Sequence, residues 1–194
     1  MIKGGAAMKQ KKIAVLVGSL RKDSYNLKMA KALATVAPDS LKFEFLQIGG
    51  LPLYNQDLED NPPSAWIAFR ESLMGVDGVL FVTPEYNRSV PAVLKNAIDV
   101  GSRPYGKSMW SGKPGAVVSV SPGAIGGFGA NHHLRQSLVF LNVPTLQQPE
   151  AYIGNAVSLF DESGNFANSS IKDFATSFMQ AFAAWVETNS VAKE

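Results

Sequence analysis

The stretch that decides the fold is KIAVLVGSLRKDSYN, residues 12–26, where an apolar run passes directly into a polar loop. Residues 12–17 are almost continuously apolar, which is typical of a strand buried on both faces of a sheet. The following residues are rich in hydroxyl, amide and basic side chains and lead into a segment of helical period. A buried strand, a polar loop and a helix in this order favour an α/β fold with a parallel sheet.

The same alternation continues along the whole chain. Short β-rich apolar runs predict strands at residues 12–17, 43–48, 78–83, 115–120 and 145–147. Segments of helical period predict helices at residues 26–36, 64–74, 92–100, 130–141 and 171–187, with Ser64 as the N-cap of the second. Five strands alternating with five helices indicate a parallel sheet covered on both faces. In such sheets, ligands bind beyond the carboxyl ends of the strands, where the winding reverses.

Length and composition limit the function classes. The 194 residues are enough for one sizeable core, and we expect a flexible N-terminal tail at residues 1–10 before a single domain at residues 11–194. The absence of cysteine excludes disulfides, thiolate nucleophiles and iron–sulfur clusters, and suits the cytoplasm. With 18 basic and 16 acidic residues and no basic stripe, the chain is not expected to bind nucleic acid. The first apolar run is too short for a membrane span, so no membrane partner is expected.

The loop after the first strand is suited to binding an anion. Ser19, Ser24 and Asn26 can donate hydrogen bonds, and Arg21 can contact two phosphate oxygens at once. The start of the next helix adds free N–H groups and a positive end. No G-x-G-x-x-G pattern is present, so a monophosphate is favoured over a pyrophosphate. An ordinary capped polar turn remains the alternative.

Two further loops follow strands on the same edge of the predicted sheet. TPEYNRSVP, residues 83–91, is stiffened by two prolines and could line a planar ligand. SPGAIGGFG, residues 121–129, is rich in glycine, which lets the backbone approach a flat ligand closely. Each loop alone also suits a plain connection between elements. Because all three loops fall at carboxyl ends of strands, together they predict a binding site.

GSLRKDSYN, TPEYNRSVPAVLKNAID and SPGAIGG resemble the NADPH-dependent FMN reductase family, and within it the bacterial chromate and quinone reductases. The likeness runs from Lys12 to Glu150. It implies a flavodoxin-like three-layer fold with strand order 2-1-3-4-5 and bound FMN. It also implies NADPH or NADH as the reductant, a small acceptor such as a quinone or chromate, and a homodimer or homotetramer.

The resemblance assigns roles to residues of all three loops. The FMN phosphate would be held by Ser19, Arg21, Ser24 and Asn26. The isoalloxazine ring would be lined by Pro84, Glu85, Tyr86 and Asn87. The far edge of the ring would be enclosed by Ser121, Gly123 and Gly126.

The resemblance also places Tyr86 and Glu150 near a subunit contact. Some relatives carry an arginine and a tyrosine where this chain has Gly129 and His132. These two departures affect the hydrogen-bond network that the resemblance implies between subunits.

The implied chemistry belongs to the flavin, so no side chain is assigned as a catalytic acid or base. NAD(P)H and the acceptor would use the same flavin face in turn, which predicts ping-pong kinetics. Arg88, Arg103 and Lys113 lie in or near segments that could border the site, where they would attract an anionic acceptor or a cofactor phosphate. Ordinary solvated basic side chains are the alternative.

Two patterns are interpreted as non-functional. GSRPYGKS, residues 101–108, matches the P-loop pattern, but a helix precedes it where a strand is required, so we expect a surface loop. His132 and His133 are adjacent and point about 100° apart on a helix, so no metal site is expected.

Two other functions remain open on the residues. An electron-carrier flavodoxin would bind FMN without using a pyridine nucleotide, although such carriers are typically strongly acidic. A flavin-less scaffold would use the fold only for protein contacts.

Overall fold

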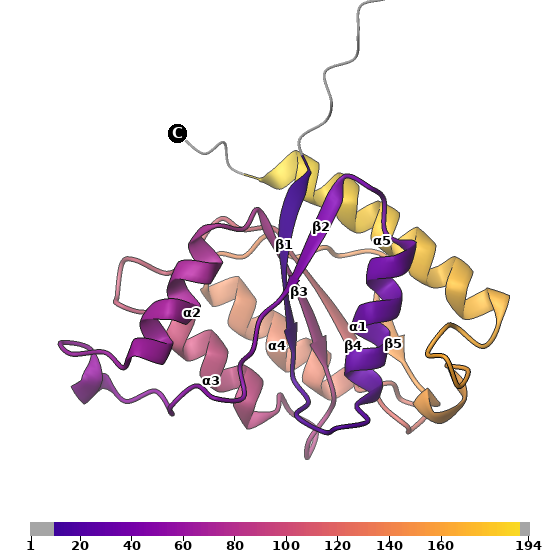
Figure 1. Ribbon diagram of the computed structural model, residues 1–194, viewed down its shortest axis with the longest axis horizontal. Helices are drawn as coiled ribbons and strands as arrows, with labels where there is room; N and C mark the ends of the chain where they lie inside the picture. Colours follow the sequence, from indigo (N-terminus) through magenta and orange to yellow (C-terminus); the bar gives the residue numbers. More distant parts are fainter. Residues whose placement is uncertain (1–9, 191–194) are drawn as a thin grey trace, which may run out of the picture.

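The computed structural model describes residues 10–190, so the predicted tail at residues 1–10 lies outside the described residues except for Gln10. One parallel sheet of five strands forms the centre, in the order β2-β1-β3-β4-β5 (Figure 1). The strands are β1 (Lys11–Val17), β2 (Leu41–Phe45), β3 (Gly78–Thr83), β4 (Gly115–Val120) and β5 (Ala151–Ile153). The predicted flavodoxin-like strand order is therefore confirmed.

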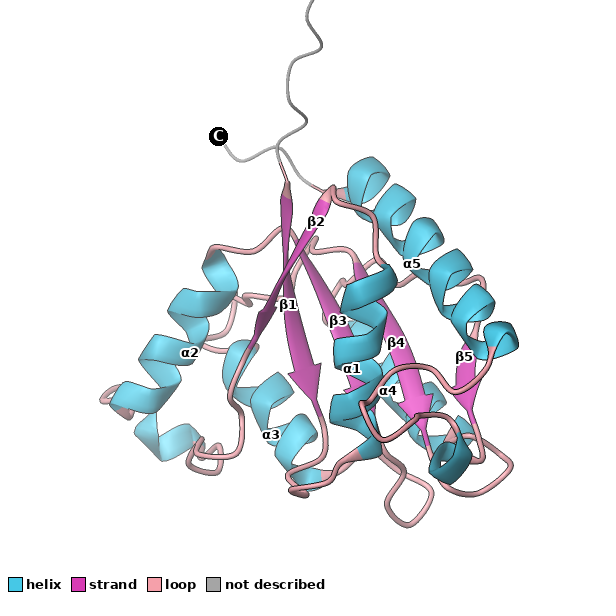
Figure 2. Ribbon diagram, turned by 45° about the vertical axis from the view of Figure 1, so that its right-hand side comes forward, coloured by secondary structure: helices cyan, strands magenta, loops and turns pink. Residues whose placement is uncertain are grey.

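Helices cover both faces of the sheet and make the fold three layers thick (Figure 2). The helices are α1 (Tyr25–Val36), α2 (Ser64–Met74), α3 (Ala92–Gly101), α4 (Phe128–Phe140) and α5 (Ser169–Asn189). Two short 3-10 turns, η1 (Gln56–Leu58) and η2 (Ala156–Ser158), lie in the connections. Helices α1 and α5 pack on one face, while α2, α3 and α4 pack on the other. Each helix returns the chain to the starting edge of the sheet, so the three polar loops gather at the opposite edge.

Alternating residues of the strands pack into two separate hydrophobic cores, one on each face of the sheet. In β1, Ile13 and Val15 face the layer of α1 and α5, whereas Ala14 and Leu16 face the other layer. β3 and β4 are buried along their whole length. Burial on both faces explains why these strands have almost no alternation of apolar and polar residues in the sequence.

The fifth strand lies later in the chain than predicted. At the predicted position, Thr145 forms only an isolated bridge to Gly115. The ladder with β4 is made instead by Ala151, Tyr152 and Ile153. Pro144 and Pro149 flank the predicted strand, and neither has an N–H to donate, so the chain leaves β4 and rejoins it after the second proline.

Smaller differences affect other element ends. β2 covers residues 41–45 and not 43–48, because its ladder with β1 begins at the pair Lys11 and Leu41. α4 begins two residues earlier than predicted, after the left-handed Gly127. Ser64 is the first residue of α2 and makes no capping hydrogen bond. No helix within residues 10–190 is long and apolar enough to cross a membrane.

Candidate active site

The three predicted loops meet at the carboxyl edge of β1, β3 and β4. They enclose a cavity of about 240 Å³. Its lining residues are Ser19, Arg21, Tyr25, Asn26, Pro84, Glu85, Tyr86, Val120, Ser121 and Pro122. The cavity is named the carboxyl-edge cavity below. It lies where an α/β sheet of this order places a ligand.

The first wall is the loop from β1 to α1. Ser24 is the N-cap of α1, and its hydroxyl oxygen accepts a hydrogen bond from the Leu27 N–H at 3.2 Å. No acceptor is found in the described part of the chain for the N–H groups of Ser19 or Arg21. The Arg21 guanidinium lies 5.8 Å from the centre of the Tyr25 ring and has no carboxylate partner among residues 10–190. Free N–H groups, a positive helix end and an unpaired cation together favour a phosphate here.

Asn26 supplies the most specific sign of a ligand. Its side chain is buried, and its Nδ2 donates to the Val120 carbonyl at 3.4 Å. Its Oδ1 is also buried and has no hydrogen-bond partner. An unsatisfied buried acceptor is costly, and a hydroxyl-bearing ligand such as the ribityl phosphate arm of FMN would satisfy it. The residues of this wall therefore suit FMN.

The second wall is a tight hairpin that begins after the buried Pro84. Tyr86 and Ser89 exchange two backbone hydrogen bonds, at 3.1 and 2.9 Å. The two residues between them, Asn87 and Arg88, have φ angles of 50° and 63°. Positive φ at both central positions is the type I′ geometry, which asparagine tolerates and arginine adopts at a cost. The hairpin places Tyr86, which is 49% exposed, at the mouth of the cavity.

Glu85 is turned away from solvent toward the start of α4. Its side chain is 11% exposed. One carboxylate oxygen accepts from the Ala130 N–H at 3.1 Å, and the other accepts from Arg88 Nη1 at 3.0 Å. The carboxylate therefore joins the hairpin to the first turn of α4, although the side chain still borders the cavity.

The third wall is the glycine-rich loop between β4 and α4. Gly126 has a φ of +66°, and a Cβ there would lie 2.5 Å from the Tyr152 carbonyl carbon, so only glycine can occupy this position without displacing β5. The Ser119 hydroxyl donates to the Gly126 carbonyl at 2.7 Å, and buried Asn131 Nδ2 donates to the Ser119 hydroxyl at 3.3 Å. This network attaches the glycine-rich loop to β4 and α4.

The structure brings most of the predicted cofactor residues together. Four of them lie outside the cavity lining, and they are Ser24, Asn87, Gly123 and Gly126. Ser24 acts as the helix cap and Gly126 as the close contact to β5. Sequence reasoning missed three lining residues, and these are Tyr25, Val120 and Pro122. All three are neighbours of residues that were predicted, so their position in the chain was the available signal.

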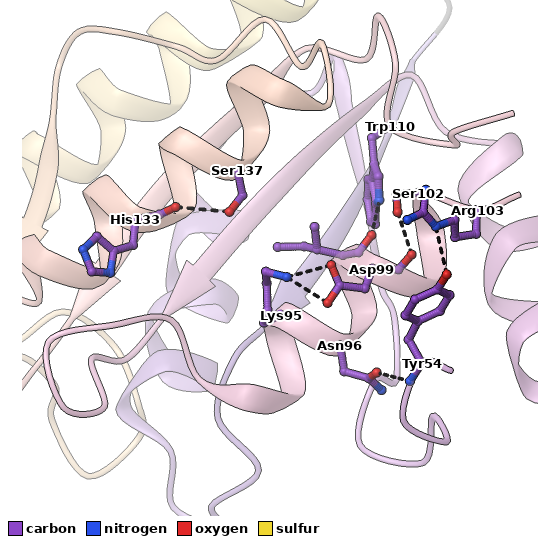
Figure 3. Close-up of polar contacts among 10 residues, drawn as sticks. Tyr54, Lys95, Asn96, Asp99, Ser102, Arg103, Trp110, His133 and Ser137 are labelled. Atoms are coloured by element: carbon purple, nitrogen blue, oxygen red, sulfur yellow. Dashed lines mark hydrogen bonds and ion pairs between the residues drawn. The ribbon is translucent and has the colours of Figure 1, made fainter. Parts of the chain in front are cut away.

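Arg103 and Lys113 lie apart from this cavity. Arg103 lines a larger groove of about 860 Å³ between α3 and α4 (Figure 3). Its Nε donates to the Tyr54 hydroxyl at 3.1 Å, which raises the pKa of Arg103, and it pairs with Glu59 at 3.3 Å. Lys113 lies just before β4 begins, at the opposite edge of the sheet from the three loops. Arg88 stays on the hairpin beside the cavity, with its side chain 71% exposed.

The two patterns interpreted as non-functional lie at the end of α3 with the loop that follows it, and on α4. α3 precedes residues 102–108 and β4 follows after a further loop, so the P-loop context is absent, as predicted. His133 Nδ1 lies 3.0 Å from the Ser89 hydroxyl and His132 Nε2 lies 2.8 Å from the Tyr152 hydroxyl. Within residues 10–190, no group of three or more His, Asp or Glu side chains is placed to hold a metal ion.

Comparison with known proteins agrees with the site geometry. A family model described as NADPH-dependent FMN reductase matches residues 11–158, which include all three walls of the cavity. The chain belongs to the NADPH-dependent FMN reductase family. It is therefore an oxidoreductase, with FMN and NAD(P)H as the cofactors.

Similar proteins are matched over nearly their full length. A quinone reductase of Pseudomonas putida is 64% identical over 91% of this reductase and 95% of its own chain. A 2-hydroxy-1,4-benzoquinone reductase of a Burkholderia species is 48% identical over 93% and 98%. The solved structure of FerB, a flavoenzyme NAD(P)H:(acceptor) oxidoreductase of Paracoccus denitrificans, has a TM-score of 0.89 at 41% identity. That match covers 93% of this reductase and 100% of FerB.

Proposed function

We propose that this enzyme reduces quinones with electrons from NAD(P)H, through FMN bound in the carboxyl-edge cavity. The observation that supports this most directly is the buried Asn26 Oδ1 without a partner, inside a cavity with an anion-ready wall. The quinone acceptor is supported by two relatives, 64% and 48% identical, whose names specify quinones. We place the whole function in one FMN-binding domain at residues 11–194.

We assign the three walls to three parts of the cofactor. The β1–α1 loop binds the phosphate through Ser19, Arg21, Ser24 and Asn26. The hairpin lines one side of the isoalloxazine through Pro84, Glu85, Tyr86 and Asn87. The glycine-rich loop lies at its far edge through Ser121, Gly123 and Gly126.

FMN, when bound, supplies the hydride and electron transfer chemistry itself. The chain contributes binding, orientation and electrostatics. Backbone N–H groups of the hairpin and the glycine-rich loop would stabilise negative charge at the polar ring edge. No side chain in the cavity is assigned a catalytic proton transfer. The exposed Tyr86 leaves the mouth open to both the nicotinamide and the quinone, which would therefore bind one after the other.

Steady-state kinetics tests this proposal. The purified holoenzyme should oxidise NADPH only when a quinone is added, and initial-rate plots at several quinone concentrations should give parallel lines. Intersecting lines would contradict the shared binding face. NADPH oxidation that is insensitive to any quinone would contradict the acceptor. An electron-carrier flavodoxin would bind FMN but would show no NADPH oxidation in this assay.

The acceptor range and the choice of pyridine nucleotide form the finer part of the proposal. The open mouth suits several small oxidants, chromate among them, and the exposed Arg88 would favour anionic ones. A panel of quinones and chromate, each run with NADH and NADPH, ranks these by kcat/KM. An Arg88→Met variant should lose activity with chromate more than with a neutral quinone.

We also propose a homodimer or homotetramer working in the cytoplasm, where NAD(P)H is produced. Support comes from exposed apolar side chains at the end of α4 and beside it. In α4, Phe140 is 86% exposed and Val139 is 75% exposed. Tyr105, which lines the groove between α3 and α4 together with Phe140, is also 86% exposed. Exposed apolar side chains grouped in this way favour a protein contact. Sedimentation equilibrium should show an oligomer, and Phe140→Asp should shift it toward the monomer. A monomeric wild type would contradict the proposal.

A further inference from the structure

We infer that Glu85 and Gly129 form a clamp within one subunit, which fixes the Tyr86 hairpin against α4 and so positions the mouth of the site for the acceptor. This inference rests on the proposed function, because it needs the hairpin to lie beside the bound flavin. Glu85 and Gly129 are positioning residues here, and Tyr86 is the residue that they place.

The clamp joins two walls of the cavity that are far apart in sequence. The Glu85 carboxylate accepts from the Ala130 N–H at 3.1 Å on one side and from Arg88 Nη1 at 3.0 Å on the other. At 11% exposure the carboxylate has little contact with solvent. The Ala130 N–H belongs to the first turn of α4, where the positive helix end stabilises a carboxylate. Because the Glu85 carboxylate is shielded from solvent, its hydrogen bond from the Ala130 N–H is stronger than an exposed ion pair.

A second contact fixes the other leg of the hairpin. His133 Nδ1 lies 3.0 Å from the Ser89 hydroxyl, one turn further along α4. Ser89 in turn exchanges both backbone hydrogen bonds with Tyr86. The hairpin is therefore attached to α4 at Glu85 and at Ser89, on either side of the strained residues Asn87 and Arg88. Strained backbone of this kind persists where its surroundings hold it.

Gly129 makes the close approach possible. A Cβ at this position would lie 2.8 Å from the Arg88 carbonyl oxygen and 2.9 Å from Glu85 Oε2. Both distances are shorter than real Cβ contacts allow, and the first obstacle is backbone. Any side chain at position 129 would therefore push the hairpin outward by several tenths of an ångström. Gly129 does not line the cavity, so within one subunit a change there reaches the acceptor through the hairpin.

The test compares Gly129→Ala, Glu85→Gln and the double variant, as FMN-loaded enzymes, with the neutral quinone menadione. A neutral acceptor removes the direct effect of changing a charge at Glu85. Displacing the hairpin by this amount should raise the KM for menadione roughly ten-fold in each single variant. Because both changes open the same clamp, the double variant should also be only about ten-fold worse, not about a hundred-fold. The FMN content per subunit should stay at the wild-type value in Gly129→Ala, because Gly129 does not line the cavity.

Gly50→Ala is the matched control, because a Cβ there meets nothing within 4 Å. It should leave the menadione KM unchanged. If Gly129→Ala lowers the melting temperature or the FMN content but leaves the KM of the loaded enzyme at the wild-type value, Gly129 is structural only and the clamp is refuted. Multiplicative effects in the double variant would also refute it. A wild type without quinone reductase activity would overturn the proposed function instead, so the two failures are distinguishable.

Discussion

Two hollows on the surface differ in size and in chemistry, and we place the candidate site in the smaller one. The groove between α3 and α4 measures about 860 Å³, whereas the carboxyl-edge cavity measures about 240 Å³. They differ in how far their polar groups are satisfied. In the groove, Lys95 pairs with Asp99 at 2.7 Å (Figure 3). Arg103 pairs with Glu59 at 3.3 Å. In the cavity, Asn26 Oδ1 has no partner.

That difference supports our proposal that FMN binds in the carboxyl-edge cavity. A groove whose charges already pair with one another gains little from a bound anion, because binding must first break those pairs. A cavity with free N–H groups and an unsatisfied buried acceptor gains from a ligand that completes them. Position at the carboxyl ends of the strands and unsatisfied polar atoms therefore identify the site better than volume does.

The largest expected effect is a loss of stability in Gly101→Ala, a change beside the groove that should leave FMN binding unaltered. In Gly101→Ala, the new methyl group would lie 2.5 Å from the fully buried Trp110 indole. Overpacking of this kind should lower the free energy of unfolding by about 3 kcal/mol. Urea unfolding of the apoprotein measures this loss, and Gly50→Ala serves as the control. The FMN affinity of the folded fraction should stay unchanged, and a matching loss of affinity would tie the groove region to the site.

Arg21→Ala should weaken FMN binding and leave the stability of the apoprotein unchanged, the reverse of Gly101→Ala. Removing a charge-assisted contact to a phosphate costs about 2 kcal/mol, which is roughly a 30-fold rise in the FMN Kd. Fluorescence titration with FMN measures this change, and urea unfolding of the apoprotein should be unaffected. Lys22→Ala, in the same loop but outside the cavity lining, is the matched control. FMN binding that is unchanged in Arg21→Ala would break the assignment of the phosphate wall.

Arg103→Gln tests whether the groove takes part in the reaction. Its ion pair with Glu59 and its bond to Tyr54 are partly exposed, so their loss should cost only about 0.5–1 kcal/mol of stability. Thermal unfolding measures this small shift. The KM values for NADPH and quinone should match those of the wild type. A change in either KM would mean that the groove, and not only the carboxyl-edge cavity, contacts a substrate.

The last expected effect appears only above pH 10 and concerns Tyr152, which supports the glycine-rich wall. Burial, together with a hydrogen bond to Glu150, raises the pKa of Tyr152 to about 12 from the ordinary value of 10. The folded state therefore keeps the phenol neutral up to a higher pH than the unfolded state does. Its contribution to stability is complete below pH 10 and is lost as pH rises from 10 to 12. A pH titration followed by absorbance at 295 nm, compared between wild type and Tyr152→Phe, should show this ionisation above pH 10. Equal unfolding curves of the wild type at pH 9 and 11 would contradict the loss of stability.

Local patterns in the sequence predicted much of this structure. The buried strands show as apolar runs such as residues 12–17, and the helices show as segments of helical period, so fold class and strand order could be predicted. The first wall could also be predicted, because Ser19, Arg21 and Asn26 are close in the chain and a helix start orders them. The position of β5 could not be predicted, since the pairing partner and two prolines decide it.

What only the tertiary structure decided is how separate loops meet. The sequence shows Glu85 as one acid in a polar loop, but its role depends on the Ala130 N–H, 45 positions away. Gly129 reads as one of several loop glycines, yet it is the one that the Arg88 carbonyl approaches. Arg103 reads as a residue near the site and lies in the other groove. Periodicity records the burial of each residue within its own element, whereas contacts between elements depend on how the whole chain packs, which no local pattern encodes.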